Sequence, residues 1–154
     1  MSYRAEGRKT PESGFTIMEL IVVIAIIATL AGLVAPEILR NASDAKVQAA
    51  RAQIEMFGLA LESYRLDNDR FPSTDQGLNS LRILPRVGDL PRNWRGPYLR
   101  RPVPVDPWGN AYRYVSPGRE NPHAYDLLSY GRDGREGGDG EDADITSWGE
   151  SAGQ

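Results

Sequence analysis

The sequence predicts an α+β fold in which one long N-terminal helix packs on a small antiparallel sheet. An almost unbroken apolar run over residues 15–35, followed by an amphipathic pattern to about residue 66, predicts the helix. Two short segments, residues 111–115 and 125–130, are rich in aromatic and apolar residues and predict strands. Ser-Pro-Gly at residues 116–118 opens their connection, as expected of a turn between neighbouring antiparallel strands.

The apolar run is long enough to cross a bilayer, because its helix would measure roughly 31 Å at about 1.5 Å per residue. It contains a single ionisable residue, Glu19. A carboxylate in hydrocarbon costs free energy and needs a partner. A cut between Gly14 and Phe15 would place a new α-amine about one helical turn from Glu19. The carboxylate of one chain would then meet the amine of a neighbouring chain.

The charges that precede the run predict its orientation in a membrane. Residues 1–14 carry three basic side chains against two acidic ones, which favours a cytoplasmic N-terminus with the bulk of the chain outside. The alternatives are a plain signal anchor and an ordinary signal peptide cleaved after Ala31 or Ala35. Against the signal peptide, the run exceeds the usual apolar core of about 7–15 residues. A glutamate also has no use in a segment that is removed.

The second half of the predicted helix has one apolar stripe, which we interpret as core. The stripe residues recur at spacings of three and four: Val47, Ala50, Ile54, Phe57, Leu61 and Tyr64. Pro36 is tolerated in a membrane helix as a kink, so we predict one bent helix from about residue 15 to 66. Beyond it, Ser73 or Thr74 is expected to cap a short helix. Residues 84–107 are predicted to be loop, with a third strand from this region left open.

Residues 133–144 hold six acidic side chains and one arginine. In a compact loop these carboxylates would repel one another, and a hard divalent cation would relieve the repulsion. Ca²⁺ accepts six to eight oxygen ligands in flexible geometry, including backbone carbonyls. The spacing is not that of an EF-hand loop. On spacing alone, a solvated and mobile acidic loop therefore stays the simpler interpretation.

The remaining composition excludes several classes of function. Cysteine is absent, so the chain has no disulfide or thiol chemistry, and a net charge of −3 gives no support for nucleic-acid binding. The only histidine, His123, lies in a Pro-rich turn and is interpreted as a surface residue. Trp108, Tyr112 and Tyr114 are expected in the core rather than on a ligand surface. No nucleophile or phosphate-binding motif occurs, so we do not expect an enzyme.

The segment Gly14-Phe15-Thr16-Ile17-Met18-Glu19 resembles the type III signal of type IV pilins and pseudopilins. The resemblance implies that a prepilin peptidase removes residues 1–14 as a leader and methylates Phe15. It implies that Glu19 is the acidic residue used in assembly and that Pro36 kinks the helix. Residues 15–36 would then be the transmembrane and filament-core helix of a pilin-like fold.

A narrower resemblance, to the major pseudopilins of type II secretion systems (the general secretion pathway protein G family), covers essentially the whole chain from Gly14 to Trp148. The segments that carry it are Leu66-Asp67-Asn68 with Phe71-Pro72, Gln76-Gly77-Leu78, Gly96-Pro97-Tyr98-Leu99, Asp106-Pro107-Trp108-Gly109-Asn110 with Tyr112 and Tyr114, Ser129-Tyr130-Gly131-Arg132-Asp133-Gly134, Gly137-Gly138 and Ala143-Asp144-Ile145.

This resemblance implies a structural subunit that polymerises from the bacterial inner membrane into a pseudopilus and helps drive folded exoproteins across the outer membrane. The expected partners are further copies of the chain, minor pseudopilins, prepilin peptidase and the inner-membrane assembly platform. The chain would cross the inner membrane once, with a cytoplasmic N-terminus and a periplasmic domain over residues 37–154. The alternatives are a type IV pilin for adhesion or motility, which commonly has a C-terminal disulfide, and a membrane-anchored calcium-binding module.

The same resemblance implies a structural Ca²⁺ in the C-terminal loop. The side chains of Asp133 and Asp144 are its first expected ligands, with Asp142 a weaker candidate and Asp139 and Glu141 undecided. Backbone carbonyls, including that of Tyr130, would complete the shell. The cation is expected to tie the last loop to the strands in place of a disulfide.

Overall fold

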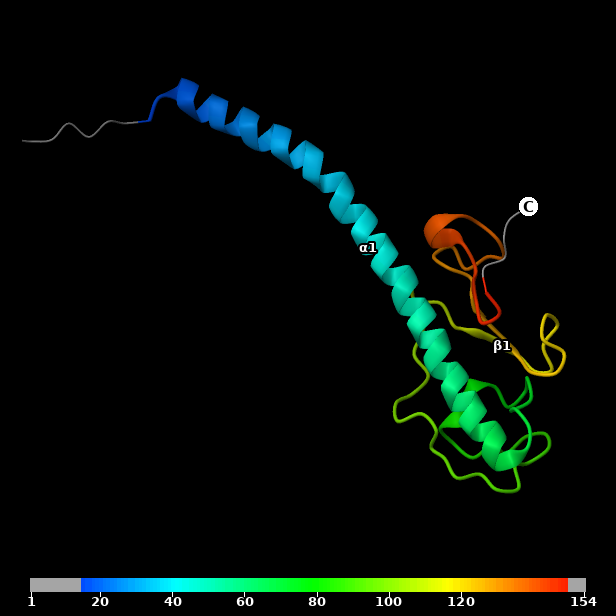
Figure 1. Ribbon diagram of the computed structural model, residues 1–154. Helices are drawn as coiled ribbons and strands as arrows, with labels where there is room; N and C mark the ends of the chain where they lie inside the picture. The colour runs from blue at the N-terminus through cyan, green and yellow to red at the C-terminus, as the bar shows by residue number, and fades with distance from the viewer. Residues whose placement is uncertain (1–14, 150–154) are drawn as a thin grey trace, which may run out of the picture. The chain divides into compact units, whose positions relative to one another are not determined.

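The computed structural model describes residues 15–149 and divides the chain into two units that meet between Arg40 and Asn41. The leader predicted over residues 1–14 lies outside the described residues. One helix, α1 (Ile17–Asn68), contributes to both units and ends close to the predicted residue 66. The kink expected at Pro36 stays a prediction. Figure 1 shows the order of the elements along the chain.

The first unit consists of the start of α1 and exposes its apolar side chains. Exposed fractions run from 82% at Phe15 to 42% at Val23. The helix begins where the Thr16 hydroxyl accepts the Glu19 N–H at 3.2 Å, as an N-cap does. Over the described part of the chain, no helix is both long and apolar enough to traverse a bilayer.

The second unit contains a three-stranded antiparallel sheet in the order β1-β2-β3. β1 (Arg113–Val115) and β2 (Asp126–Ser129) pair with Tyr114 opposite Leu127, which confirms the two predicted strands. The third strand, β3 (Ile145–Thr146), pairs with the other edge of β2. It comes from the C-terminal segment and not from the loop region that the sequence left open. In the described structure, residues 84–107 form neither helix nor strand.

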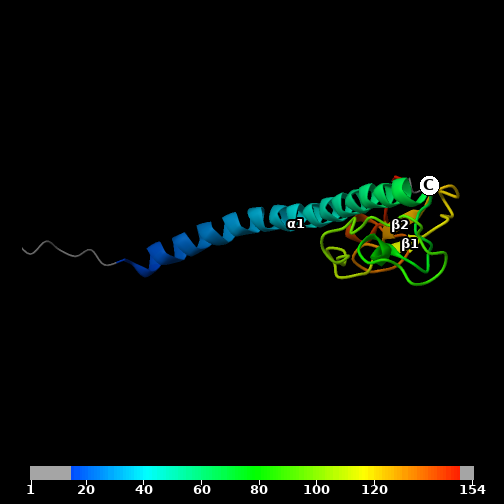
Figure 2. The ribbon, with the colours of Figure 1, turned by 90° about the horizontal axis from the view of Figure 1, so that it is seen from below.

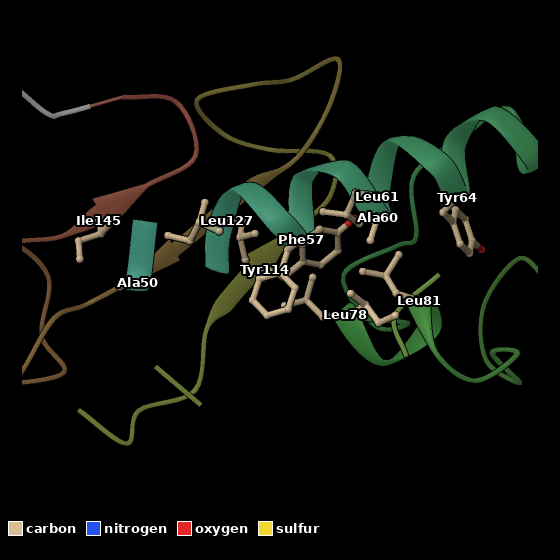
Figure 3. Close-up of a cluster of buried hydrophobic side chains, with 12 residues drawn as sticks. Ala50, Phe57, Ala60, Leu61, Tyr64, Leu78, Leu81, Tyr114, Leu127 and Ile145 are labelled. Atoms are coloured by element: carbon tan, nitrogen blue, oxygen red, sulfur yellow. The ribbon is translucent and has the colours of Figure 1, made fainter. Parts of the chain in front are cut away.

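The core of this unit lies between α1 and the sheet. The α1 residues of the unit run along one side of β1 and β2 (Figure 2). The predicted stripe is confirmed as core, because Phe57, Leu61 and Tyr64 are fully buried and point toward the sheet and the short helix (Figure 3). Phe57 also meets the Tyr112 ring edge-on, with centroids 5.2 Å apart. The buried apolar residues are Ala50, Ile54, Phe57, Ala60, Leu61, Tyr64, Leu78, Leu81, Leu99, Tyr114, Leu127 and Ile145.

A short 3-10 helix, η1 (Leu78–Leu81), lies where the sequence predicted a short helix, and its two leucines enter the core. The expected cap lies one turn earlier. Ser73 and Gln76 exchange reciprocal side-chain to backbone hydrogen bonds of 3.0 and 3.3 Å around the preceding turn. The residue at the N-cap of η1 is Gly77, which has φ of 60° and forms no side-chain cap. Ser73 therefore stabilises the turn that leads into the helix.

Candidate functional site

The N-terminal motif lies at the start of the described residues. Gly14 falls outside them, and Phe15 is their first residue. Glu19 lies in the first turn of α1, where its charge suits the positive end of the helix dipole. Its side chain is exposed and takes part in no ion pair within residues 15–149.

The second candidate site is the acidic loop, residues 130–144, which joins β2 to β3 and includes the 3-10 helix η2 (Gly140–Asp142). Its beginning and end are held together by Arg132. The Arg132 guanidinium donates to both carboxylate oxygens of Asp142, at 2.9 and 2.8 Å, and to Glu141 Oε2 at 3.1 Å. The Arg132 N–H also donates to the Glu141 carbonyl at 2.7 Å. These contacts commit Asp142 and Glu141 to Arg132, a partner that the sequence analysis did not identify.

Asp144 is the acidic residue of this loop whose buried carboxylate is only partly hydrogen-bonded. Its Oδ2 accepts the Gly137 N–H at 3.0 Å, but its Oδ1 is buried without a hydrogen-bond partner among the described residues. Burial raises the pKa of Asp144, and the negative charges of Glu136 and Asp133 raise it further, while the Gly137 N–H opposes the shift. A buried unpaired carboxylate oxygen beside like charges is the arrangement that a cation would satisfy.

The other predicted ligands discussed with Asp144 are exposed or half-buried. Asp133 is exposed, and its Oδ1 accepts the Arg135 N–H at 3.1 Å. Asp139 is exposed, and Tyr130 is half-buried directly after β2. Within the described residues, no group of three or more histidine, aspartate or glutamate side chains is disposed to hold a metal ion. The residues present therefore fit a cation only if Asp133 and Asp144 act with backbone carbonyls, a set of oxygens that suits Ca²⁺.

The backbone of the acidic loop depends on two glycines. Gly131 has φ of +65°, and a Cβ atom there would lie 2.5 Å from the Glu141 carbonyl oxygen. Gly138 has φ of +91°, and a Cβ atom there would lie 2.5 Å from the Asp142 carbonyl oxygen. Both positions combine a left-handed conformation with close backbone contact, which only glycine tolerates without strain. The backbone of the acidic loop therefore packs closely against itself at these two glycines.

The remaining predictions concern three aromatic residues and the single histidine. Tyr114 is buried in the core and Tyr112 is half-buried against it, as predicted, and burial raises the pKa of both phenols well above its ordinary value. Trp108 packs against the same core. His123 is exposed, also as predicted.

A long N-terminal helix that packs on a small antiparallel sheet, preceded by a signal-like motif, defines the class of pilin-like subunits. In agreement, the family described as "Prokaryotic N-terminal methylation motif" matches residues 9–35. The family described as "Type II secretion system (T2SS), protein G" matches residues 37–148. The chain belongs to the type II secretion system protein G family.

Similar proteins from several bacteria carry the name type II secretion system core protein G. The chain is 43% identical to the one from Pseudomonas aeruginosa, over 92% of this chain and 98% of that protein. It is 44% identical to the one from Vibrio cholerae, over 89% and 92% of the two chains. The crystal structure of the major pseudopilin from the type 2 secretion system of enterohaemorrhagic Escherichia coli superimposes with a TM-score of 0.60 at 38% identity, covering 70% of this chain and 90% of that one.

Proposed function

We propose that this chain is the repeating subunit of a type II secretion pseudopilus, which polymerises from the inner membrane and helps drive folded exoproteins across the outer membrane. One observation carries the proposal. A methylation motif over residues 9–35 is followed directly by a protein G domain over residues 37–148, so one chain combines the signal for processing with the domain of a major pseudopilin. Its role is structural, with no catalytic step of its own.

Processing would begin at the bond between Gly14 and Phe15, which prepilin peptidase cleaves on the cytoplasmic side before Phe15 is methylated. Residues 15–36 would anchor the chain in the inner membrane, with the domain over residues 37–154 in the periplasm. The sequence supports this orientation through the excess of basic residues before the apolar run.

Assembly would bring the apolar segments of many copies together. In the single chain the side chains from Phe15 to Leu30 are largely exposed and therefore need lipid or other copies as neighbours. Moving the segment from lipid into a protein core gains little hydrophobic free energy, since lipid tails are equally apolar. A pair between Glu19 and the Phe15 amine of the next copy would instead set the register. Its net free energy is small, but leaving one member unpaired costs more.

A structural Ca²⁺ is proposed for the acidic loop, with Asp133 and Asp144 as side-chain ligands. Support comes from the buried, unpaired Oδ1 of Asp144 and from the neighbouring charge of Asp133. When bound, the cation neutralises these carboxylates and fixes the segment between β2 and β3. Asp142 is a poorer candidate than the sequence implied, because Arg132 occupies both of its carboxylate oxygens.

Assembly can be tested by expressing the full chain with a prepilin peptidase and the secretion machinery in bacterial membranes. Mass spectrometry should find a mature N-terminus at methylated Phe15, and crosslinking should give a ladder of oligomers. Glu19→Ala should be processed but give several-fold fewer filaments, whereas Glu37→Ala, at an exposed position on the same helix, should assemble normally. A mature chain that starts beyond residue 30, or a chain that stays monomeric on crosslinking, would overturn the proposal.

A further inference from the structure

A turn over residues 106–110 (Asp-Pro-Trp-Gly-Asn) lies beside the acidic loop and is organised around one buried carboxylate. Asp106 is 3% exposed, and its Oδ1 accepts the N–H groups of Trp108 at 3.1 Å and Asn110 at 2.8 Å. The Asp106 N–H donates to the Asn110 carbonyl at 2.8 Å, which closes the turn. Hydrogen bonds within the turn therefore fix its shape. The side chains of Trp108 and Asn110 make contacts outside it.

The turn contacts the acidic loop where the loop begins. The Asn110 amide donates from Nδ2 to the Gly131 carbonyl at 2.8 Å. Asp106 Oδ2 accepts the Ser129 hydroxyl at 2.6 Å, and the same hydroxyl oxygen accepts the Gly131 N–H at 3.2 Å. Both backbone groups of Gly131 are thus held by the turn, one directly and the other through Ser129. Gly131 is the last residue before Arg132 and Asp133.

The turn also contacts the loop near its end. The Trp108 indole N–H donates to Glu141 Oε1 at 3.4 Å, and the other oxygen of this carboxylate accepts from Arg132. The segment that bears Asp133 and Asp144 is therefore held at both ends by groups that are not themselves expected to bind the cation.

We propose that the turn 106–110 positions the cation site, with Asn110 and Trp108 holding the acidic loop folded before the cation arrives. The inference rests on the Ca²⁺ site proposed above. A loop that is already ordered loses less conformational freedom on binding, so the cation binds more tightly. Groups that orient the ligands of a metal typically contribute about 10–100-fold to its affinity. Asn110 and Trp108 are positioning residues in this sense, because they act on the ligands through the backbone and through Glu141.

The test is a Ca²⁺ titration of the full-length protein in mild detergent, using calcium chloride in competition with a fluorescent chelator. All variants are measured at a temperature where their melting curves in chelator show them folded. Asn110→Ala should raise the Kd about tenfold or more. Trp108→Phe keeps an aromatic side chain and removes the five-membered ring with its N–H donor to Glu141, so it should raise the Kd by a smaller factor. Asn79→Ala, at an exposed asparagine of η1, is the control and should leave the Kd unchanged.

The outcomes separate the positioning role from the site itself. If the native chain binds Ca²⁺, Asp133→Ala does not, and both turn variants bind more weakly, the inference is supported. If Asn110→Ala and Trp108→Phe are folded and bind Ca²⁺ like the native chain, the turn has only a structural role and the inference is wrong. If Asn110→Ala does not fold, Trp108→Phe decides the question alone. If the native chain binds no Ca²⁺, the proposed site fails and the positioning role fails with it.

Discussion

Asp106 and Ser129 are twenty-three positions apart in the sequence, and they share a buried hydrogen bond of 2.6 Å between carboxylate and hydroxyl. Ser129 is fully buried at the end of β2, and Asp106 begins the turn that precedes β1. A buried carboxylate is costly unless its oxygens are satisfied, and here three donors from three residues satisfy it. The pair therefore links the loop before the sheet to the end of β2, from which the acidic loop departs.

Replacing Asp106 by alanine should destabilise the protein strongly. The change leaves the Ser129 hydroxyl and two backbone N–H groups without their acceptor, at about 1–3 kcal/mol for each buried unsatisfied group. We expect the free energy of unfolding to fall by roughly 3 kcal/mol or more, measured by urea denaturation of the full chain in mild detergent. Asp75→Ala, at an exposed carboxylate, should change it by less than about 0.5 kcal/mol. Equal stability of the two variants would contradict this account of Asp106.

Asp126 should make the protein sensitive to acid. Burial would raise the pKa of Asp126, but the N–H groups of Glu120, Arg119 and Asn121 donate to its carboxylate and bring the pKa below its ordinary value of 3.8. A pKa that is lower in the folded state gives stability that is present above pH 3.8 and lost as pH falls through the folded pKa. Asp126→Asn should therefore lower the melting temperature at neutral pH, with the deficit shrinking below pH 3.8. A deficit that stays constant with pH would show that charge has no part in it.

Asp144 should behave in the opposite way when metal is absent. Its pKa is raised in the folded state, so the folded chain holds a proton that the unfolded chain releases above pH 3.8. Stability in chelator should fall as pH rises from 3.8 through the raised pKa, and Asp144→Asn should remove that decline. At pH 7 in chelator, the variant should melt no lower than the native chain.

With Ca²⁺ added, the native chain should melt at a higher temperature than Asp144→Asn. The cation should raise the melting temperature of the native chain and leave Asp144→Asn and Asp133→Ala unmoved, because both variants lack an expected ligand. Asp75→Asn should respond to Ca²⁺ like the native chain. If the native melting curve is the same in chelator and in Ca²⁺, the structural cation is refuted.

The sequence predicted the parts of the fold that repeat with a period. The stripe from Val47 to Tyr64 became core because burial on a helix follows its spacing, and β1 and β2 lie within the two predicted segments. The two-residue strand β3 has no pattern of its own. It is a strand only because β2 offers it a free edge and Ile145 has a place in the core, which are properties of the folded chain.

The sequence predicted which acidic residues the candidate site contains, but it did not predict which of them pair with Arg132. The sequence analysis treated six carboxylates of one segment as mutually repelling, but Arg132, just before that segment, binds two of them, Glu141 and Asp142. Which two it binds depends on the turns made by the intervening glycines. The hydrogen bond between Asp106 and Ser129 was equally out of reach, because neither residue belongs to a periodic pattern. Side-chain contacts between distant loops have no signature in a single sequence.

The contrast between Phe57 and Leu59 tests whether the periodic stripe carries the stability of the domain. The two residues lie two positions apart on α1, but Phe57 is fully buried and Leu59 is 73% exposed. Phe57→Ala removes a ring packed against Tyr112 and leaves a cavity, at a cost of about 3–5 kcal/mol. Leu59→Ala should change the free energy of unfolding by less than about 0.5 kcal/mol.

The yield of crosslinked oligomers, compared with the amount of folded protein, should distinguish contacts between copies from the stability of the single chain. An exposed leucine gives the single chain little stability, yet other copies are expected to cover parts of its surface in a polymer. Leu59→Ala should therefore fold like the native chain, and any loss of crosslinked oligomers in this variant would come from contacts between copies. Phe57→Ala should lose oligomers only as far as it loses folded protein, which circular dichroism of the same samples measures. A large destabilisation by Leu59→Ala would contradict the exposure of this position in the folded domain.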